Sequence, residues 1–144
     1  MAGFIADPAE ATAKLPAVPR LALVQPACEA RTLSGQALTK STMDLYSHML
    51  SMQRVHQSYA GTGVVGLAVA ASMPGTIVHG VLKEGKVTGD GKIKSSRIRL
   101  GHPSGILEVE VQVDPNGTLD RVSMGRTARR LMDGRVYVPV SLLG

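Results

Sequence analysis

The sequence contains few of the residues that mark a redox, metal or membrane protein. Among its 144 residues there is one cysteine, Cys28, one phenylalanine and no tryptophan, and aromatic residues make up 3%. A single cysteine excludes an intrachain disulfide, and with four scattered histidines and no CxxC pair we expect no metal site. No apolar run approaches the ~20 residues of a membrane span, and no signal peptide is recognisable. We therefore expect a cytoplasmic protein with no membrane partner.

The charge balance is basic, with 16 Lys and Arg against 11 Asp and Glu and a formal net charge of +5. Such an excess suits either nucleic acid or an anionic small molecule. The basic residues are spread along the chain except for Arg126, Arg129 and Arg130, and no aromatic residues lie between them for stacking on bases. We therefore expect a small-molecule anion and no nucleic acid. The three arginines could pair with substrate carboxylates or form a solvated charged strand, and we favour the second.

Composition divides the chain into a short N-terminal stretch and one domain. Residues 1–18 are rich in Ala and Pro, with helical character around Ala9–Lys14. We interpret them as a linker or as the remnant of an upstream segment. Residues 19–144 are numerous enough to bury a core of their own, which Val, Leu, Ile, Ala and Met must build. The domain begins with an apolar run, Leu21–Gln25, that predicts a strand.

Two segments favour helices. Apolar positions between Thr42 and Gln53 allow an amphipathic helix, which Ser41 or Thr42 could cap. Residues 64–71 are apolar all round, which predicts a helix buried on every side. This second helix opens at the string Gly-Thr-Gly of residues 61–63 and stops before Pro74. At about ten residues it is too short to cross a membrane.

The remaining segments favour antiparallel β structure. Residues 106–113 alternate cleanly between apolar and polar side chains, and Pro115-Asn116-Gly117 is a turn signal. The expected strands are Thr76–Leu82, Ile93–Leu100, Ile106–Val113 and Leu119–Met124. A hairpin of Ala128–Met132 with Arg135–Val140 is expected around Asp133-Gly134. A loop is expected at Lys83–Lys92. A helix at Thr127–Met132 is the competing interpretation of the hairpin's first arm. The pattern predicts an α+β fold, in which a curved, mostly antiparallel sheet wraps around one central buried helix.

Four segments resemble the PrpF family of methylaconitate isomerases and oxalomesaconate tautomerases, in the order found there. They are LPAVPRLALVQP (15–26), LSMQRVHQSYAGTGVVGLAVAASMPGT (50–76), GHPSGILEVEV (101–111) and RTARRLMDGRVYVP (126–139). The resemblance covers nearly the whole chain and implies a diaminopimelate-epimerase-like fold. It matches the second of the family's two domains. We therefore expect that the first domain, which supplies the Lys and Cys thought to move the proton, is missing from this chain.

The resemblance also points to a substrate site. Free N–H groups at Gly61, Thr62 and Gly63 could bind a carboxylate, because the positive end of the helix dipole lies there. Taken alone, this string is better explained as a tight loop before a helix. The turn from Gly101 to Gly105 is, by itself, a structural turn between strands. In the family this motif lines the substrate cleft.

That placement implies that His102 and Ser104 donate to a substrate carboxylate, with Gly105 beside them. It further places Ser51, Met52 and His56 next to the cleft as possible contacts. No catalytic residue is assigned within this chain. Ala60 stands where diaminopimelate epimerase has a catalytic cysteine, so racemisation between two opposed thiols is not expected.

The function implied is that of the substrate-binding half of a proton-transfer isomerase or tautomerase acting on an unsaturated tricarboxylate such as an aconitate. We expect no cofactor. The alternative is a non-catalytic oligomeric binding module, or a truncated fragment that lacks the catalytic first domain. Because a domain separated from its partner exposes an apolar face, we also expect a homo-oligomer or a missing first domain as partner.

Overall fold

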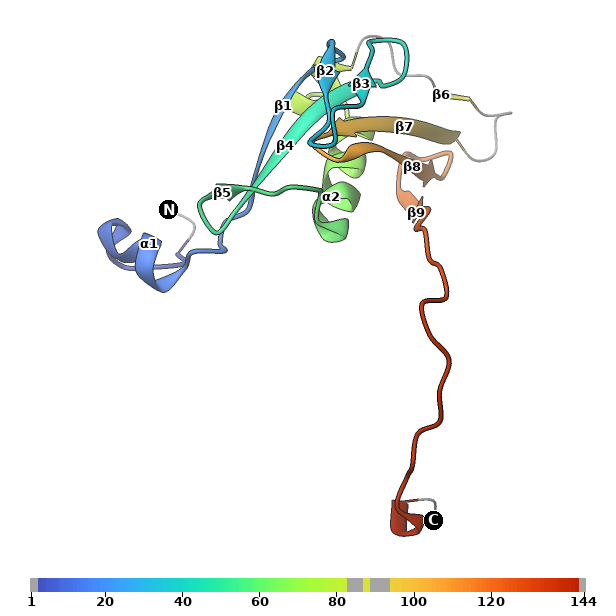
Figure 1. Cartoon of the computed structure of the whole chain (residues 1–144). Helices are drawn as coiled ribbons and strands as arrows, with labels where there is room; N and C mark the ends of the chain where they lie inside the picture. The colour runs from blue at the N-terminus through green and yellow to red at the C-terminus, as the bar shows by residue number, and fades with distance from the viewer. Residues whose placement is uncertain (1–2, 83–86, 89–93, 143–144) are drawn as a thin grey trace.

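A computed structural model of the chain describes residues 3–82, 87–88 and 94–142 (Figure 1). Its centre is a seven-stranded sheet with the order β1-β4-β7-β8-β9, in which β5 pairs with β4 and β6 with β7. The strands are β1 Leu21–Pro26, β4 Leu45–Ser51, β5 Arg54–Val55, β6 Val87–Thr88, β7 Lys94–His102, β8 Gly105–Val113 and β9 Leu119–Met124. A separate small hairpin consists of β2 Ala30–Arg31 and β3 Ala37–Leu38. Only β4 and β7 are parallel among the described strand pairs, so the mostly antiparallel sheet and the mixed α and β composition are confirmed.

One helix, α2 (Gly61–Ser72), lies against a face of this sheet (Figure 1). Its side chains Val64, Leu67, Ala68 and Ala71 are buried, and they form the core with buried residues of β4, β7 and β8. The predicted helix is therefore confirmed, including its start at Gly61. The prediction that it is buried on every side is wrong for the described chain, because Gly66 is exposed and several neighbours are only half-buried.

The predicted helix at Thr42–Gln53 is wrong, because these residues form the interior strand β4. This strand pairs with β1 on one side and with β7 on the other, and Leu45, Tyr46 and Ser47 are buried one after another. A strand covered on both faces loses the strict alternation of apolar and polar residues. The remaining apolar pattern cannot be told from that of a helix by periodicity alone.

Two further predictions fail. Thr76–Leu82 forms a short helix, α3 (Ile77–Val81), because the Thr76 side chain caps it by accepting from the His79 amide at 3.1 Å. The C-terminal hairpin and the competing helix are both absent, since residues 125–139 have no regular structure and run away from the body (Figure 1). A lone hairpin without a sheet to join is marginal in water. A 3-10 turn, η2 (Val140–Leu142), ends the described chain.

The other predicted elements are present. The strands β1, β7, β8 and β9 match the expected runs, and the turn before β9 closes with the Gly117 amide donating to the Asp114 carbonyl at 3.0 Å. The N-terminal stretch contains η1 (Pro8–Glu10) and α1 (Ala11–Lys14), as its composition indicates. The loop expected at Lys83–Lys92 lies outside the described residues except for β6.

An ion pair joins the two parallel strands. Arg99, in β7, donates from Nη2 to Asp44 Oδ1 at 2.8 Å and from its backbone amide to Asp44 Oδ2 at 2.7 Å. The Asp44 amide in turn donates to the Arg99 carbonyl at 2.8 Å. The β4–β7 ladder has just two residue pairs, Leu45 with Leu100 and Tyr46 with Gly101. The ion pair therefore anchors a short parallel junction in the middle of the sheet.

We expect Asp44→Ala to lower the free energy of unfolding by about 2 kcal/mol or more, because a partly buried guanidinium and a backbone amide both lose their acceptor. The matched control is Glu108→Ala, which removes a 4.0 Å pair between exposed side chains of Arg97 and Glu108. That control should cost at most about 0.5 kcal/mol. Urea unfolding followed by circular dichroism measures both. Equal losses in the two variants would show that the Asp44 pair does not anchor the sheet.

Candidate carboxylate-binding site

The first turn of α2 presents backbone donors without any acidic side chain. Its N-cap, Ala60, has no capping group, and the first turn contains no acid. The first intrahelical bond runs from the Val64 amide to the Ala60 carbonyl, so the amides of residues 61–63 have no partner within the helix. The positive end of the helix dipole lies at the same place. This end of α2 is therefore suited to an anion.

Two arginines reach this turn from opposite edges of the sheet. Arg20, just before β1, donates from Nη1 to the Thr62 hydroxyl at 3.1 Å. Arg126, just after β9, places Nη2 only 2.6 Å from where a Cβ on Gly61 would stand. Because β1 and β9 are the first and last strands of the sheet order, the sheet must curve around α2 for both arginines to meet its start. Neither arginine takes part in an ion pair within the described residues.

The glycines of the first turn allow these close approaches. A Cβ on Gly63 would lie 1.8 Å from Met49 Cε, so the helix start is pressed directly onto β4. Beside it, a hollow of about 310 Å³ lies between β1 and α2. Its lining is mostly apolar and consists of Arg20, Ala22, Val24, Met49, Thr62, Gly63, Gly66, Leu67 and Val78. The arrangement offers cationic and hydroxyl groups at one end and apolar contact along the rest.

The turn from Gly101 to Gly105 joins β7 to β8, and His102 pairs with Gly105 at its base. His102 is 4% exposed, and its Nδ1 accepts from the Ser104 amide at 3.1 Å. The Ser104 hydroxyl donates to the Gln57 carbonyl in the loop that precedes α2. Gly105 has φ +141°, a conformation that favours glycine. The turn is thereby tied to the segment that leads into the candidate site.

Burial controls the protonation of this region. It lowers the pKa of His102, and the nearby His56 lowers it further. Burial likewise raises the pKa of Tyr59, whose ring lies edge-on to His102 with centroids 6.4 Å apart. The Tyr59 hydroxyl shares a hydrogen bond of 2.9 Å with Ser47. Both rings are therefore neutral near neutral pH.

Apart from Gly61, Thr62 and Gly63 in the first turn of α2, the predicted site residues form two groups in the structure. His56, His102 and Ser104 lie together, since His56 is close enough to affect the pKa of His102 and Ser104 bonds to the residue after His56. Ser51 and Met52 lie at the turn between β4 and β5, where Met52 has φ 50° and an exposed side chain. Within the described chain no hydrogen bond joins Ser51 or Met52 to the first group. Their contact with a substrate stays a prediction.

The sequence did not identify Arg20 as a site residue. For Arg126 it favoured a solvated strand over pairing with a substrate carboxylate. Arg20 has no local signal, because its partner Thr62 is 42 residues away and only the fold brings them together. Arg126 was expected to be part of a solvated strand. The structure instead places its guanidinium against Gly61, whereas Arg130 pairs with Asp133 in the exposed C-terminal segment.

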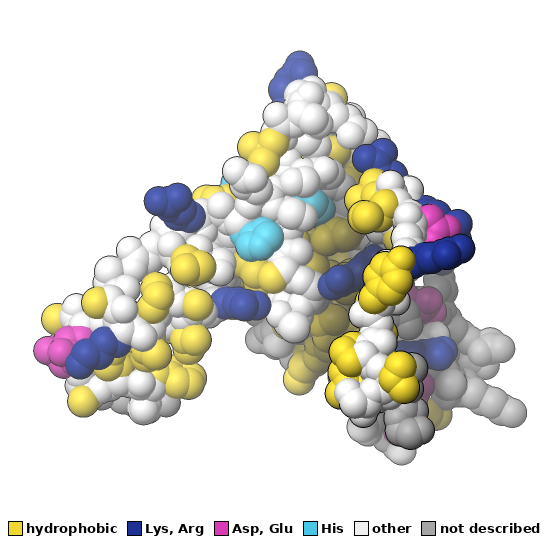
Figure 2. All heavy atoms as spheres, turned by 60° about the horizontal axis from the view of Figure 1, so that its bottom comes forward, with side chains coloured by type: hydrophobic (Ala, Val, Ile, Leu, Met, Phe, Trp, Pro, Cys, Tyr) yellow, Lys and Arg dark blue, Asp and Glu magenta, His cyan; other side chains and the backbone are white. Residues whose placement is uncertain are grey.

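Figure 2 shows that histidine side chains lie near the centre of a hollowed face, with Lys and Arg side chains on both sides. Among the described residues visible there, Asp and Glu side chains lie toward the periphery. Such a distribution favours an anionic ligand over a cationic one.

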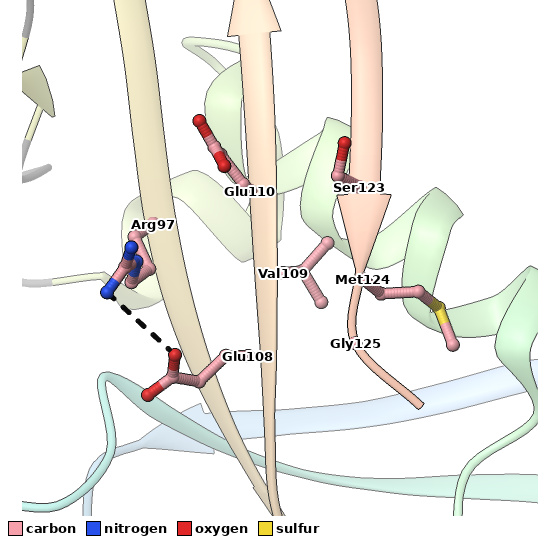
Figure 3. Close-up of a pocket in the computed structure, with 7 residues that line it drawn as sticks. All are labelled: Arg97, Glu108, Val109, Glu110, Ser123, Met124 and Gly125. Atoms are coloured by element: carbon pink, nitrogen blue, oxygen red, sulfur yellow. Dashed lines mark ion pairs between the residues drawn. The ribbon is translucent and has the colours of Figure 1, made fainter. Parts of the chain in front are cut away.

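A second hollow, of about 330 Å³, lies near β9 and is lined by Arg97, Glu108, Val109, Glu110, Ser123, Met124 and Gly125 (Figure 3). Its two carboxylates outnumber its one guanidinium. Arg97 pairs with Glu108, and Glu110 accepts from the Ser95 hydroxyl at 2.7 Å and the Gln112 amide at 2.9 Å. These hydrogen bonds lower the pKa of Glu110. This hollow therefore offers less to an anion than the start of α2.

Comparison with known proteins places this chain in a family. The family model described as PrpF protein matches residues 1–139. The chain belongs to the PrpF family. It is 38% identical over 137 residues to a 3-methylitaconate isomerase of Eubacterium barkeri, covering 94% of this chain and 34% of that protein. It is 36% identical over 140 residues to a 2-methyl-aconitate isomerase of Cupriavidus necator, covering 95% of this chain and 33% of that protein.

The crystal structure of a methylitaconate-delta-isomerase superposes with a TM-score of 0.70 at 36% identity, covering 98% of this chain and 35% of that one. This PrpF chain thus spans about a third of the length of the relatives it matches, and its family is one of isomerases. The described residues contain no group of three or more His, Cys, Asp or Glu placed to hold a metal ion. In the same part of the chain, no helix has the length and apolar character needed to cross a membrane.

The buried His102 leads to a prediction about how the stability of this PrpF chain depends on pH. The pKa of His102 is lowered in the folded state from its ordinary value of 6.5, so the unfolded chain takes up the proton first. Its contribution to stability is complete above that value and is lost as the pH falls through the folded pKa. Urea unfolding across a pH series should therefore show a loss on acidification, with a slope of at most about 1.4 kcal/mol per pH unit from this one group. His102→Asn, which retains an acceptor for the Ser104 amide, should flatten that part of the curve. An unchanged slope would exclude His102 as the source.

Proposed function

We propose that this chain is the substrate-binding part of a PrpF isomerase that acts on an unsaturated polycarboxylic acid, of which a methylated aconitate is the leading example. The observation that carries the proposal is the convergence of Arg20 and Arg126 on the first turn of α2, without an acidic partner among the described residues. The names of the relatives support a carboxylic acid of this kind. We further infer a diaminopimelate-epimerase-like fold, which the curvature of the sheet around α2 supports.

The role assigned to this site is the binding of a negatively charged carboxylate. A carboxylate at the start of α2 would accept from backbone amides and from the guanidinium groups of Arg20 and Arg126. The same groups stabilise the negative charge that spreads over the acid when a proton is removed next to its double bond. The base that removes the proton, in this proposal, comes from the family's first domain. In this proposal no step requires a cofactor. A cytoplasmic location is also part of the proposal.

The second candidate function, a non-catalytic oligomeric module, has one observation in its favour. The C-terminal segment of the described chain carries strongly exposed apolar side chains, namely Leu131, Met132, Val136, Tyr137, Val140 and Leu142. Large exposed apolar surfaces are usually covered by a partner. A second copy or the family's first domain would cover these apolar side chains equally well. The observation therefore does not favour the module, and the isomerase proposal is the stronger one.

The proposal predicts that trans-aconitate stabilises the chain. At a ligand concentration about ten times its Kd, the melting temperature should rise by roughly 3 °C, because ligand binds the folded state alone. Arg20→Gln and Arg126→Gln should each weaken the binding about tenfold, since each removes a charge-assisted hydrogen bond. Differential scanning fluorimetry over a ligand series measures the saturable rise.

The controls are acetate at equal ionic strength and the variant Arg97→Gln. Replacing Arg97 removes one positive charge, as the other two substitutions do. Its guanidinium, however, pairs with Glu108 at the other hollow. Its removal should leave the rise unchanged. If trans-aconitate raises the melting temperature no more than acetate does, carboxylate binding by this chain is rejected. If all three arginine variants lose the rise equally, the binding is only an effect of net charge.

A further inference from the structure

The C-terminal arm, residues 125–142, leaves the domain without being covered by it. It follows β9 and extends away from the body as far as η2 (Figure 1). Within the described part of the chain, no hydrogen bond joins the arm to the rest of the domain, and those it makes stay inside the arm. Its apolar side chains are exposed all the same, with Val136 at 87% and Val140 at 84%. A run of such side chains is usually covered by another surface.

The last part of the arm, Arg135–Val140, has the sequence of an outermost strand. In an extended chain its three valines lie on one face, and β-branched and aromatic residues fit a sheet. The backbone groups of the three valines then point to one edge and those of Pro139 to the other. Because proline has no N–H to donate, that second edge cannot carry a regular ladder. The segment is therefore suited to close the edge of a sheet that it does not itself contain.

One edge of the sheet lacks the usual protection against a further strand. β1 ends the strand order, five of its six residues are exposed, and none of them is charged. Its side chains Leu21 and Leu23 are 55% and 58% exposed. The opposite edge strand, β9, contains Asp120 and Arg121, and charged side chains discourage the pairing of edges. β1 is therefore the edge better suited to accept the arm.

The two faces of β1 match those of the arm segment. Ala22 and Val24 face the hollow beside α2, whose lining is mostly apolar. The valines of an added strand would continue this apolar wall, because alternate residues of neighbouring strands share a face. Tyr137, on the other face, would then lie beside Leu21 and Leu23. The added strand would thus cover apolar surface on both sides of the sheet.

We propose that two copies of this chain exchange their arms, so that Arg135–Val140 of each copy pairs antiparallel with the free edge of β1 in the other. A partner of another sequence would have to supply both an edge for the arm and a strand for β1, whereas a second copy carries both. Exchange of identical elements is a low-cost route to a symmetric dimer. The inference goes beyond the proposed function and does not depend on which acid the site binds.

Pairing of the arm with β1 of its own chain is less favourable. The root of the arm and the beginning of β1 both lie at the first turn of α2, where Arg126 and Arg20 meet it. An arm that folded back would therefore cross this turn and run parallel to β1. Parallel pairs are slightly less stable than antiparallel ones. The exchanged arm avoids the crossing and leaves the start of α2 open.

The exchange buries enough surface for a stable dimer. Six large apolar side chains of each arm are exposed, and covering them in both copies buries on the order of 1,500 Å² together with the surface they cover. Stable interfaces bury about 1,200–2,000 Å² in total. The hollow beside α2 in each copy is then walled by a strand of the other. The apolar end of the candidate site is thus incomplete in a single chain.

Sedimentation equilibrium of the full chain tests the exchange. We expect a dimer, at about twice 15.1 kDa, at micromolar concentrations. Val136→Asp should weaken it about 100-fold or more, because symmetry places the new carboxylate in both junctions. Leu23→Lys should do the same from the receiving edge, since an edge lysine opposes pairing. The matched controls, Leu33→Asp and Leu33→Lys, change a side chain that is 68% exposed in the β2–β3 hairpin and should leave the dimer intact.

Mixing the two defective variants distinguishes arm exchange from other dimers. In a mixture of Val136→Asp and Leu23→Lys, the intact arm of the second can pair with the intact edge of the first. One of the two junctions is then restored, and a heterodimer is expected although each variant alone is monomeric. A mixture that stays monomeric overturns the reciprocal exchange. A monomeric wild-type chain, or a dimer that either substitution leaves intact, overturns the inference as well.

A second measurement needs no substitution and so does not depend on the folding of a variant. In a dimer formed from 13C-labelled and unlabelled chains, isotope-filtered spectra report contacts between copies alone. We expect such contacts from the methyl groups of Val136, Val138 and Val140 to those of Ala22 and Val24. A dimer without these contacts overturns the inference. The binding of trans-aconitate is measured separately, so either result leaves the proposed function to its own test.

Discussion

The geometry of the candidate site depends on how closely the first turn of α2 lies to the sheet. A side chain at Gly63 would overlap the end of Met49, and one at Gly61 would lie within 2.6 Å of the Arg126 guanidinium. Without these two glycines the side chains of Met49 and Arg126 would have to move from their present positions. The same closeness brings the unpaired amides of the turn to the place where Arg20 and Arg126 meet. The packing of the helix start and the proposed anion site thus both depend on the absence of a Cβ at positions 61 and 63.

The sheet supplies the rest of the geometry through its curvature and its parallel junction. Arg20 and Arg126 are far apart in sequence and belong to the flanks of opposite edge strands, β1 and β9. They meet because the sheet curves around α2 and because β4 and β7, in its middle, are held together by Asp44 and Arg99. The β7–β8 turn with His102 then lies against the loop that leads into α2, joined by the bond from Ser104 to Gln57. The two arginines and the β7–β8 turn are carried by separate segments, and the same core positions both.

Much of the architecture could be predicted from the sequence, and the failures have common causes. The strand β8 alternates cleanly because Val109 and Val111 are buried while Glu108 on the other face is exposed, and α2 is marked by its uniform apolar run between Gly61 and Pro74. The helix predicted at Thr42–Gln53 failed because an interior strand is buried on both faces and has no alternation to read. The C-terminal hairpin failed because turn chemistry at Asp133-Gly134 does not create a sheet to join. These errors concern tertiary surroundings, which local patterns do not contain.

The candidate site could be predicted only in part. The Gly-Thr-Gly string and the turn around His102 were identified by their resemblance to PrpF sequences, and the structure ties His56, His102 and Ser104 together. Arg20 could not be identified, because nothing near it in sequence distinguishes it from the other basic residues. The roles within the turn also required coordinates. The sequence offers Ser104 and His102 as equivalent donors, whereas the hydrogen bonds show that the amide and the hydroxyl of Ser104 already donate within the fold.

The claim that the start of α2 is the carboxylate site is tested most directly by nuclear magnetic resonance of the 15N-labelled chain during a titration with trans-aconitate. The binding geometry predicts saturable shifts of the backbone amides of Gly61, Thr62 and Gly63, because these donors would lie against the ligand. Acetate at equal ionic strength should not reproduce them. Shifts confined to the hollow around Arg97 and Glu108, with the amides of residues 61–63 unchanged, would contradict the assignment of the site.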